Sequence, residues 1–175
     1  MNKIIDQTFK VAIYLRLSKE DDDLSCSSGA KSESNSISNQ RKLIYDFMKS
    51  HPELELYDEY KDDGKSGSNF DRAEFQRMMK DIEAGKVNCV VVKDQSRFGR
   101  DYIDVGKYKE KIFPKLGVRF ITINEGYDSL SATSSDDLAF TINSFVYDFY
   151  IRDISTKIRT NLTAKKQNGE YAGAF

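Results

Sequence analysis

The sequence predicts an α/β fold, with a mainly parallel sheet flanked by helices and a long helix towards the C-terminal end. Two observations lead to this prediction. Short apolar runs alternate with helix-length amphipathic segments, which is the pattern of chains that join parallel strands through helices. The last helical pattern, residues 135–167, is much longer than the usual helix of a globular domain.

Four apolar runs are expected to form the strands: residues 10–17, 54–60, 87–92 and 118–123. The third run is rich in valine and nearly unbroken, as expected for a central strand that is buried on both faces. In the first run, alternate residues point to opposite faces of the sheet. Tyr14, Arg16 and Ser18 therefore share one face.

Helices are expected between the strands, at residues 36–50, 71–84 and 101–116. Asp71 and Glu74 form a capping signal at the start of the second helix, and Gly85 closes it. Its apolar stripe, which we assign to the core, comprises Phe75, Met78, Met79 and Ile82. Asp101 and Gly117 are the expected start and stop signals of the third helix.

A polar loop, Asn124 to Ser135, is expected between the last strand and the long helix. The apolar residues in the first half of this helix are Leu138, Phe140, Ile142, Phe145, Val146, Phe149, Tyr150 and Ile151. They occupy more than one side of the helix, so we expect it to contact both its own domain and another subunit. A helix buried on two sides within its own domain is the alternative.

Composition excludes several classes of function. No apolar run approaches the roughly 20 residues of a membrane span, and residues 1–7 lack the apolar stretch of a secretory signal. We therefore expect a cytoplasmic protein without membrane contact. Cys26 and Cys89 have no metal-ligand spacing, and His51 is the only histidine, so neither a zinc site nor a Ser-His-Asp triad is available.

The net charge of −1 and the pI near 5.9 give no general sign of nucleic-acid binding. Residues 152–166 differ from the rest, because they carry five basic residues against Asp153 alone. These candidate nucleic-acid contacts are Arg152, Lys157, Arg159, Lys165 and Lys166. Nucleotide binding is not expected, because Glu59 stands where a P-loop ending in Gly64-Lys65-Ser66 would need its first glycine.

Polar residues that suit a phosphate follow the carboxyl ends of three expected strands. They are Arg16 to Ser18, Asp62 to Gly67, and Lys93 to Arg100. Open α/β sheets bind ligands at the carboxyl ends of their strands, so we expect these segments to converge. Arg16 would lie near the sheet centre and needs an anion, either a carboxylate of the protein or a substrate phosphate.

A serine, several arginines and a glutamine around a phosphate suit phosphoryl transfer. Catalysis of that reaction consists mostly of positioning and of electrostatic stabilisation of the phosphate oxygens. Arginine donates paired hydrogen bonds to phosphate and stays charged at any working pH, so it can replace a metal ion. We therefore expect no metal and no cofactor.

Two segments near the N-terminus resemble the serine site-specific recombinases, the family of resolvases and invertases. Tyr14-x-Arg16-x-Ser18 resembles the strand on which the family's serine attacks the scissile phosphodiester and forms a transient phosphoserine link to the DNA 5′ end. Ser36 to Arg41 looks like the opening of the family's first helix, which places Gln40 beside the phosphate.

Two later segments resemble the same family. Asp63 to Ser68 with Asp71-Arg72 is similar to its active-site loop, and Ser96 to Asp101 resembles the loop that supplies two arginines. The catalytic residues that the resemblance implies are Tyr14, Arg16, Ser18, Gln40, Asp63, Ser66, Arg72, Arg97 and Arg100. The four arginines would form a cationic cradle, with the last two presented by one helical turn.

The resemblance also implies how the protein works. Residues 1–134 would be the catalytic core, 135–167 an oligomerisation helix that approaches DNA, and 168–175 the start of a further domain. A dimer or tetramer would pair two DNA sites, make staggered double-strand breaks and rejoin the strands. The acceptor for the Ser18 proton is open between Asp63 and an arginine-bound water.

Three features look closer to the large, transposon-borne branch of the family. Ser96 stands where small resolvases usually carry aspartate, residues 150–157 lack their glutamate-arginine pairs, and a long insertion separates Ser18 from Gln40. A noncatalytic α/β module is the alternative from a different class. It would bind a nucleotide or a DNA phosphate in the same arginine-lined site, with Ser18 only a hydrogen-bond donor.

Overall fold

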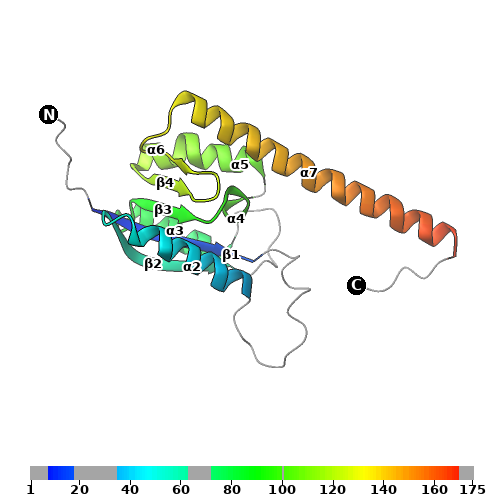
Figure 1. Ribbon diagram of the computed structural model, residues 1–175, viewed down its shortest axis with the longest axis horizontal. Helices are drawn as coiled ribbons and strands as arrows, with labels where there is room; N and C mark the ends of the chain where they lie inside the picture. Colours follow the sequence, from blue (N-terminus) through cyan, green and yellow to red (C-terminus); the bar gives the residue numbers. More distant parts are fainter. Residues whose placement is uncertain (1–7, 18–34, 63–71, 100, 170–175) are drawn as a thin grey trace, which may run out of the picture.

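The computed structural model describes residues 8–17, 35–62, 72–99 and 101–169, and the predicted α/β fold is confirmed (Figure 1). A five-stranded sheet with the order β2-β1-β3-β4-β5 lies at its centre. Its strands are β1 (Phe9–Arg16), β2 (Leu54–Asp62), β3 (Cys89–Val92), β4 (Arg119–Thr122) and β5 (Tyr127–Asp128). The first four are parallel to one another, and β5 pairs antiparallel with β4.

The helices join these strands and cover the sheet. They are α2 (Asn35–Lys49), α3 (Ala73–Glu83), α4 (Gln95–Phe98), α5 (Tyr102–Lys107), the π-helix η1 (Tyr108–Ile112), α6 (Phe113–Leu116) and α7 (Ser134–Gln167). Helix α5 begins as predicted, because the Asp101 carboxylate accepts hydrogen bonds from the amides of Ile103 and Asp104. The segment ends as predicted at Gly117, whose φ of 66° lies in the left-handed region that favours glycine.

Each face of the sheet has its own hydrophobic core. One core is largely aliphatic and joins Ile37 and Ile44 of α2 to residues of β1 such as Ile13. The other core contains most of the buried aromatic side chains, among them Tyr14 and Phe75. The alternation predicted for the first strand is therefore confirmed. β3 is buried at every position, as predicted for a central strand.

Strand β5 lies inside the segment that the sequence predicts to be a polar loop. Its pairing with β4 is supported by Arg119, whose guanidinium donates to both carboxylate oxygens of Asp128, at 3.0 and 2.7 Å. The strand was missed because two residues are too few to make an alternating pattern.

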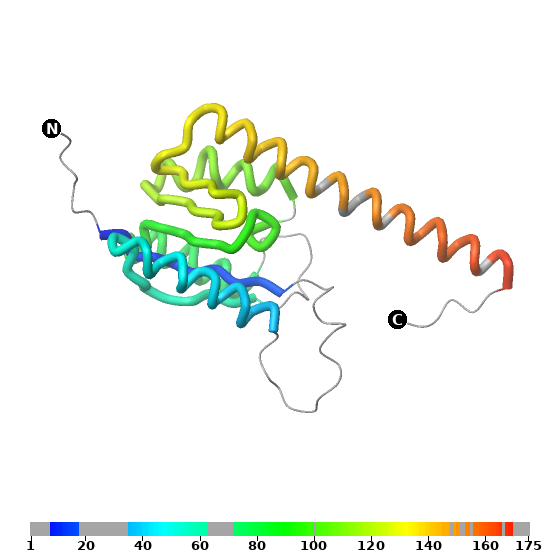
Figure 2. Tube along the Cα trace, in the orientation of Figure 1, coloured from blue at the N-terminus to red at the C-terminus, as the bar shows by residue number. Residues whose placement is uncertain are grey.

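Helix α7 packs on the core at its N-terminal end and then extends away from it (Figures 1 and 2). Among its described side chains, only Phe140 and Ser144 are buried. Its exposed large apolar side chains are Leu138, Ile142, Phe145, Val146, Tyr147, Phe149, Tyr150, Ile154 and Ile158. The alternative of a helix buried on two sides within its own domain is therefore wrong. No helix in the described ranges combines the length and the apolar composition needed to cross a membrane.

Candidate active site

The described parts of the three predicted polar segments lie close together at the carboxyl ends of β1, β2 and β3, while Ser18, residues 63–67 and Arg100 lie outside the described residues. β1 ends at Arg16 and β2 at Asp62, which are register partners in neighbouring strands, and α4 follows β3. Arg72, which precedes α3, reaches the same edge and donates a 2.9 Å hydrogen bond to Tyr14. Arg16 and Arg72 are almost completely buried, with 3% and 2% of their surface exposed.

Arg16 is held by the backbone of α4. Its Nε donates to the carbonyl oxygen of Arg97 at 3.0 Å, and one Nη donates to the carbonyl oxygen of Ser96. The sequence left a carboxylate and a substrate phosphate as possible partners, but these contacts are with carbonyl oxygens. They fix the direction of the guanidinium in the protein itself, which is the preorganisation that electrostatic catalysis requires.

Gln40 and Arg97 hold the last backbone unit of β1. The Gln40 side chain is buried, and its Nε2 donates to the carbonyl oxygen of Arg16 at 3.2 Å, while its Oε1 lies 3.4 Å from the Arg16 amide. Nη1 of Arg97 lies 3.4 Å from the same carbonyl oxygen. The backbone is therefore fixed from α2 and from α4 at a point two residues before Ser18.

A hydrogen-bonded chain links Arg72, β1, β2 and α3. Arg72 donates to the Tyr14 hydroxyl, and this hydroxyl donates to Oδ2 of Asp62 at 2.9 Å. Asp62 also accepts hydrogen bonds from the amides of Glu74 and Phe75 at the start of α3, at 3.1 and 3.0 Å. Burial is the main cause that raises the pKa of Tyr14 well above its ordinary value, so the hydroxyl stays protonated.

Asp62 belongs to this network, but the sequence reasoning, which placed it at the start of the second polar segment, gave it no role of its own. That reasoning named Asp63 for the site and Asp71 for the helix cap, and both lie outside the described residues. Helix α3 has Arg72 at its N-cap position without a side-chain cap, so Asp62 supplies the capping carboxylate. The sequence could have indicated this role. Asp62 lies two residues after the buried Tyr60, and the alternation of a strand places both side chains on one face.

Helix α4 is a four-residue helix that is capped by Asp94. The Asp94 carboxylate accepts hydrogen bonds from the amide of Arg97 at 3.0 Å and from the hydroxyl of Ser96 at 2.6 Å. The prediction that Arg97 and Arg100 share one helical turn is wrong. The helix ends at Phe98, and Gly99 has an extended backbone with φ −157°, so the chain leaves the helix before Arg100.

The predicted catalytic residues divide into two groups. Those that the structure brings together are Tyr14, Arg16, Gln40, Arg72 and Arg97. Those that lie outside the described residues are Ser18, Asp63, Ser66 and Arg100. The described neighbour of Ser18 is Leu17, whose amide donates to the carbonyl oxygen of Asp62 at 3.3 Å. The chain therefore still runs beside β2 one residue before Ser18.

The predicted nucleic-acid contacts lie on the far half of α7, which extends away from the sheet (Figure 1). Lys157, Arg159 and Lys165 are exposed, and Lys157 forms an ion pair with Asp153 at 2.7 Å. The side chains of Arg152 and Lys166 lie outside the described set. The structure therefore keeps the basic residues of α7 apart from the arginine cluster, by which we mean Arg16, Arg72 and Arg97.

Comparisons with known proteins agree on one family. The family model for the resolvase N-terminal domain matches residues 11–171. The N-terminal catalytic domain of TP901-1 integrase has a similar structure, with a TM-score of 0.60 and 27% identity over 82% of this chain and 97% of that chain. A resolvase family site-specific recombinase from Streptococcus pneumoniae has a TM-score of 0.56 and 27% identity, over 91% and 99% of the two chains.

A third solved structure shares the fold at lower identity. It is the C-terminal catalytic domain of ISC1926 TnpA, an IS607-like serine recombinase, with a TM-score of 0.52 and 21% identity over 92% of this chain and 99% of that one. A search of curated proteins finds no match. The family model nevertheless spans most of the chain, including most of β1 and the whole of α7. The chain therefore belongs to the resolvase family, as a serine recombinase catalytic domain.

Proposed function

We propose that this domain breaks and rejoins DNA strands, with Ser18 as the nucleophile that forms a 5′-phosphoserine link. The observation that carries the proposal is the fixed end of β1. Arg16 is held through its side chain by α4 and through its backbone by Gln40. A nucleophile that follows this rigid point would act beside preoriented guanidinium groups, which favours in-line attack on a phosphodiester.

The arginines have the role of charge stabilisation in this scheme. Arg16, Arg72, Arg97 and Arg100 stabilise the negative charge on the non-bridging phosphate oxygens in the transition state, with Ser66 as a further hydrogen-bond donor. Arginine stays charged at any working pH, so the mechanism requires no metal ion and no cofactor. Tyr14 and Gln40 act as positioning residues, together with Asp62, because each contacts an arginine or the end of β1.

The proposed reaction conserves the phosphodiester bond energy. The Oγ of Ser18 bonds to phosphorus, the bond from phosphorus to the DNA 3′ oxygen breaks, and that oxygen takes a proton from a water molecule and leaves as a 3′ hydroxyl. The Ser18 proton passes to Asp63 or to a water molecule bound by an arginine. Attack by a 3′ hydroxyl on the phosphoserine link then restores a DNA strand and releases Ser18, so rejoining needs no nucleotide.

Helix α7 is proposed as the surface on which subunits associate. Contiguous exposed apolar side chains usually mark a protein interface, and those of α7 include Phe145, Phe149 and Tyr150. Pairing two DNA sites requires more than one subunit, so we propose a dimer that assembles into a tetramer. The exposed Lys157 and Arg159 further along α7 would contact DNA phosphates.

We assign the protein to the large, transposon-borne branch of the family, which excises or inserts a mobile element on the DNA of the cell. The long insertion between Ser18 and Gln40 and the serine at position 96 support this assignment. The proposed organisation is a catalytic core in residues 1–134, the subunit helix in 135–167 and the start of a further domain in 168–175.

Ser18→Ala in the full-length protein tests the nucleophile. We expect covalent attachment to DNA to be lost, while DNA affinity changes by less than about threefold, since the phosphate contacts that position the protein remain. Denaturing gels with labelled DNA, obtained by selection for binding to the protein, measure the attachment. A covalent product that persists in this variant would overturn the assignment of Ser18.

Excess EDTA tests the metal-free mechanism. We expect the rate of covalent attachment to be the same with and without the chelator, because the arginines supply the positive charge. The control is a metal-dependent restriction endonuclease on the same DNA, which EDTA must stop. Attachment that requires added Mg²⁺ would contradict the proposed role of the arginines.

A further inference from the structure

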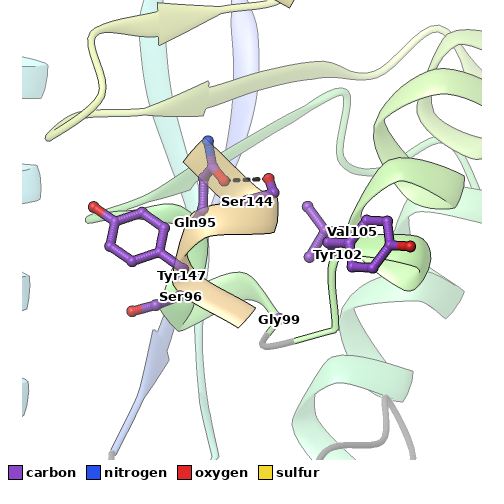
Figure 3. Close-up of a pocket in the computed structure, with 7 residues that line it drawn as sticks. All are labelled: Gln95, Ser96, Gly99, Tyr102, Val105, Ser144 and Tyr147. Carbon is purple, nitrogen blue, oxygen red and sulfur yellow. Dashed lines mark hydrogen bonds between the residues drawn. The ribbon is translucent and has the colours of Figure 1, made fainter. Parts of the chain in front are cut away.

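Helix α7 is tied to α4 by a buried polar contact (Figure 3). The hydroxyl of Ser144 donates to Oε1 of Gln95, and Nε2 of Gln95 donates to the carbonyl oxygen of Phe140 at 3.2 Å. Gln95 and Ser144 are both buried. The side-chain amide of Gln95 therefore contacts one turn of α7 with both its oxygen and its nitrogen.

The residues that follow Gln95 in α4 contact the arginine cluster. The carbonyl oxygens of Ser96 and Arg97 accept hydrogen bonds from Arg16, and that of Phe98 accepts one from Arg72 at 3.1 Å. α4 is only four residues long. A helix this short has no interior that could absorb a displacement, so a movement of Gln95 is expected to shift these carbonyl groups as well.

The surroundings of Ser144 leave little room for a replacement partner. Tyr102, Val105 and Tyr147 are among the residues that line the space beside the contact (Figure 3), and its volume is about 10 Å³. One water molecule needs at least this much space together with polar partners. If the Ser144 hydroxyl were removed, Oε1 of Gln95 would lose its donor, and the amide would have to turn to regain one.

We propose that Gln95 and Ser144 are positioning residues that couple α7 to Arg16 and Arg97. The inference rests on the proposed function, in which these arginines stabilise the phosphate and α7 meets another subunit. A change in how α7 packs on its partner would move Ser144, and Gln95 would transmit the movement to α4. The arrangement of the arginines, and with it the rate of DNA cleavage, would then depend on the assembly of the subunits.

The coupling can be measured on this chain without DNA. Arg16 Nε–H is buried and donates to the carbonyl oxygen of Arg97, so its exchange with solvent, followed by ¹⁵N NMR, should be slow. We expect Ser144→Ala to accelerate this exchange by about tenfold. Ser144→Thr keeps the hydroxyl and should restore slow exchange. Unchanged exchange in folded Ser144→Ala would overturn the coupling.

Thr141→Ala is the matched control on the same helix. Thr141 is exposed, and its hydroxyl donates to the carbonyl oxygen of Asp137, four residues earlier, at 2.9 Å; the Oγ of Ser144 lies at a similar distance, 3.0 Å, from the carbonyl oxygen of Phe140, but its single proton is directed to Gln95. This variant should leave the exchange of Arg16 unchanged, and an equal acceleration would overturn the proposal. A Gln95→Met background gives a second test, in which Ser144→Ala should add no further acceleration. Additive effects would mean that Ser144 does not act through Gln95.

Cleavage by the full-length protein completes the experiment. At saturating protein, Ser144→Ala should lower the rate constant of covalent attachment to DNA by about tenfold, with the half-saturating concentration unchanged and with rescue by Ser144→Thr. If Ser144→Ala accelerates the exchange of Arg16 Nε–H but leaves this rate constant unchanged, the positioning role is overturned. If the parent protein itself forms no link through Ser18, the proposed function fails, and the exchange measurement still decides the coupling between α7 and Arg16.

Discussion

Buried arginines are held in different ways at the two edges of the sheet. At the carboxyl edge, Arg16 donates to backbone carbonyl oxygens and Arg72 to the hydroxyl of Tyr14. At the amino edge, Arg119 forms ion pairs with Asp128 at 2.7 Å and with Glu53 at 3.4 Å. The described contacts of Arg16 and Arg72 orient their guanidinium groups, and Arg97 has the Asp94 carboxylate at 4.0 Å, whereas Arg119 is paired with carboxylates at closer range.

We propose that this difference corresponds to a catalytic and a structural use of the same side chain. A dipolar contact with a carbonyl group fixes the direction of a guanidinium, which is the preorganisation that the proposed stabilisation of a phosphate requires. A carboxylate pair compensates the cost of burying the charge and ties two segments together. Variants at the carboxyl edge should therefore affect cleavage most, and variants at the amino edge should affect stability most.

The largest expected effect is that of Arg97→Ala on cleavage. Removal of one guanidinium from the carboxyl edge should lower the rate of covalent attachment to DNA on the order of 10²- to 10³-fold. The free energy of unfolding should change by about 1 kcal/mol or less, because the contact of Arg97 with the end of β1, at 3.4 Å, and its ion pair with Asp94, at 4.0 Å, are both long. Single-turnover kinetics and thermal unfolding measure the two quantities. A loss of stability without a loss of rate would assign Arg97 to the structural group.

Arg119→Met should show the opposite behaviour. Asp128 and Glu53 lose their cation, so we expect the free energy of unfolding to fall by about 2 kcal/mol, below the range for a fully buried pair because both carboxylates are partly exposed. The attachment rate of the folded protein should not change. Arg77→Met is the control, since Arg77 also pairs with carboxylates but is 41% exposed and should cost about 1 kcal/mol or less. If the two variants lost the same free energy of unfolding, Arg119 would be no more important for stability than an exposed arginine.

Tyr14→Phe has the smallest expected effect, and this effect should depend on pH. Loss of the hydroxyl that joins Arg72 to Asp62 should cost about 1 kcal/mol of stability. Because burial raises the pKa of Tyr14 in the folded state, the folded chain holds this proton more tightly than the unfolded chain does. The stability that follows from the raised pKa is fully present below about pH 10 and falls as the pH rises above it. We expect the free energy of unfolding, measured with denaturant between pH 8 and pH 11, to fall less steeply with pH in Tyr14→Phe than in the parent protein. The same slope in both proteins would contradict this account.

Much of the fold follows from local patterns in the sequence. Period-two alternation identified the faces of β1, the valine-rich run identified the buried strand β3, and Gly117 marked the end of α6. These features depend on neighbours in the chain. The two-residue strand β5 does not, because it exists only through its pairing with β4.

The site could be predicted in part for the same reason. Arg16 and Arg97 stand out in the sequence as charged residues at strand ends, but their partners are backbone carbonyls, which every residue has. The contact between Gln95 and Ser144 joins polar residues 49 positions apart, and neither lies in a motif. The burial of Asp62 could have been predicted, since the alternation of β2 continues to the last residue of the strand.

The sheet has two outer strands that offer little to another chain. β5 is two residues long, and β2 carries the charged residues Glu55, Asp58, Glu59 and Lys61 along its length. Short or charged outer strands are the usual protection against the addition of further strands. We therefore expect that strand addition at β2 or β5 does not join copies of this domain, so that clustering at high concentration is reversible rather than growing into fibrils.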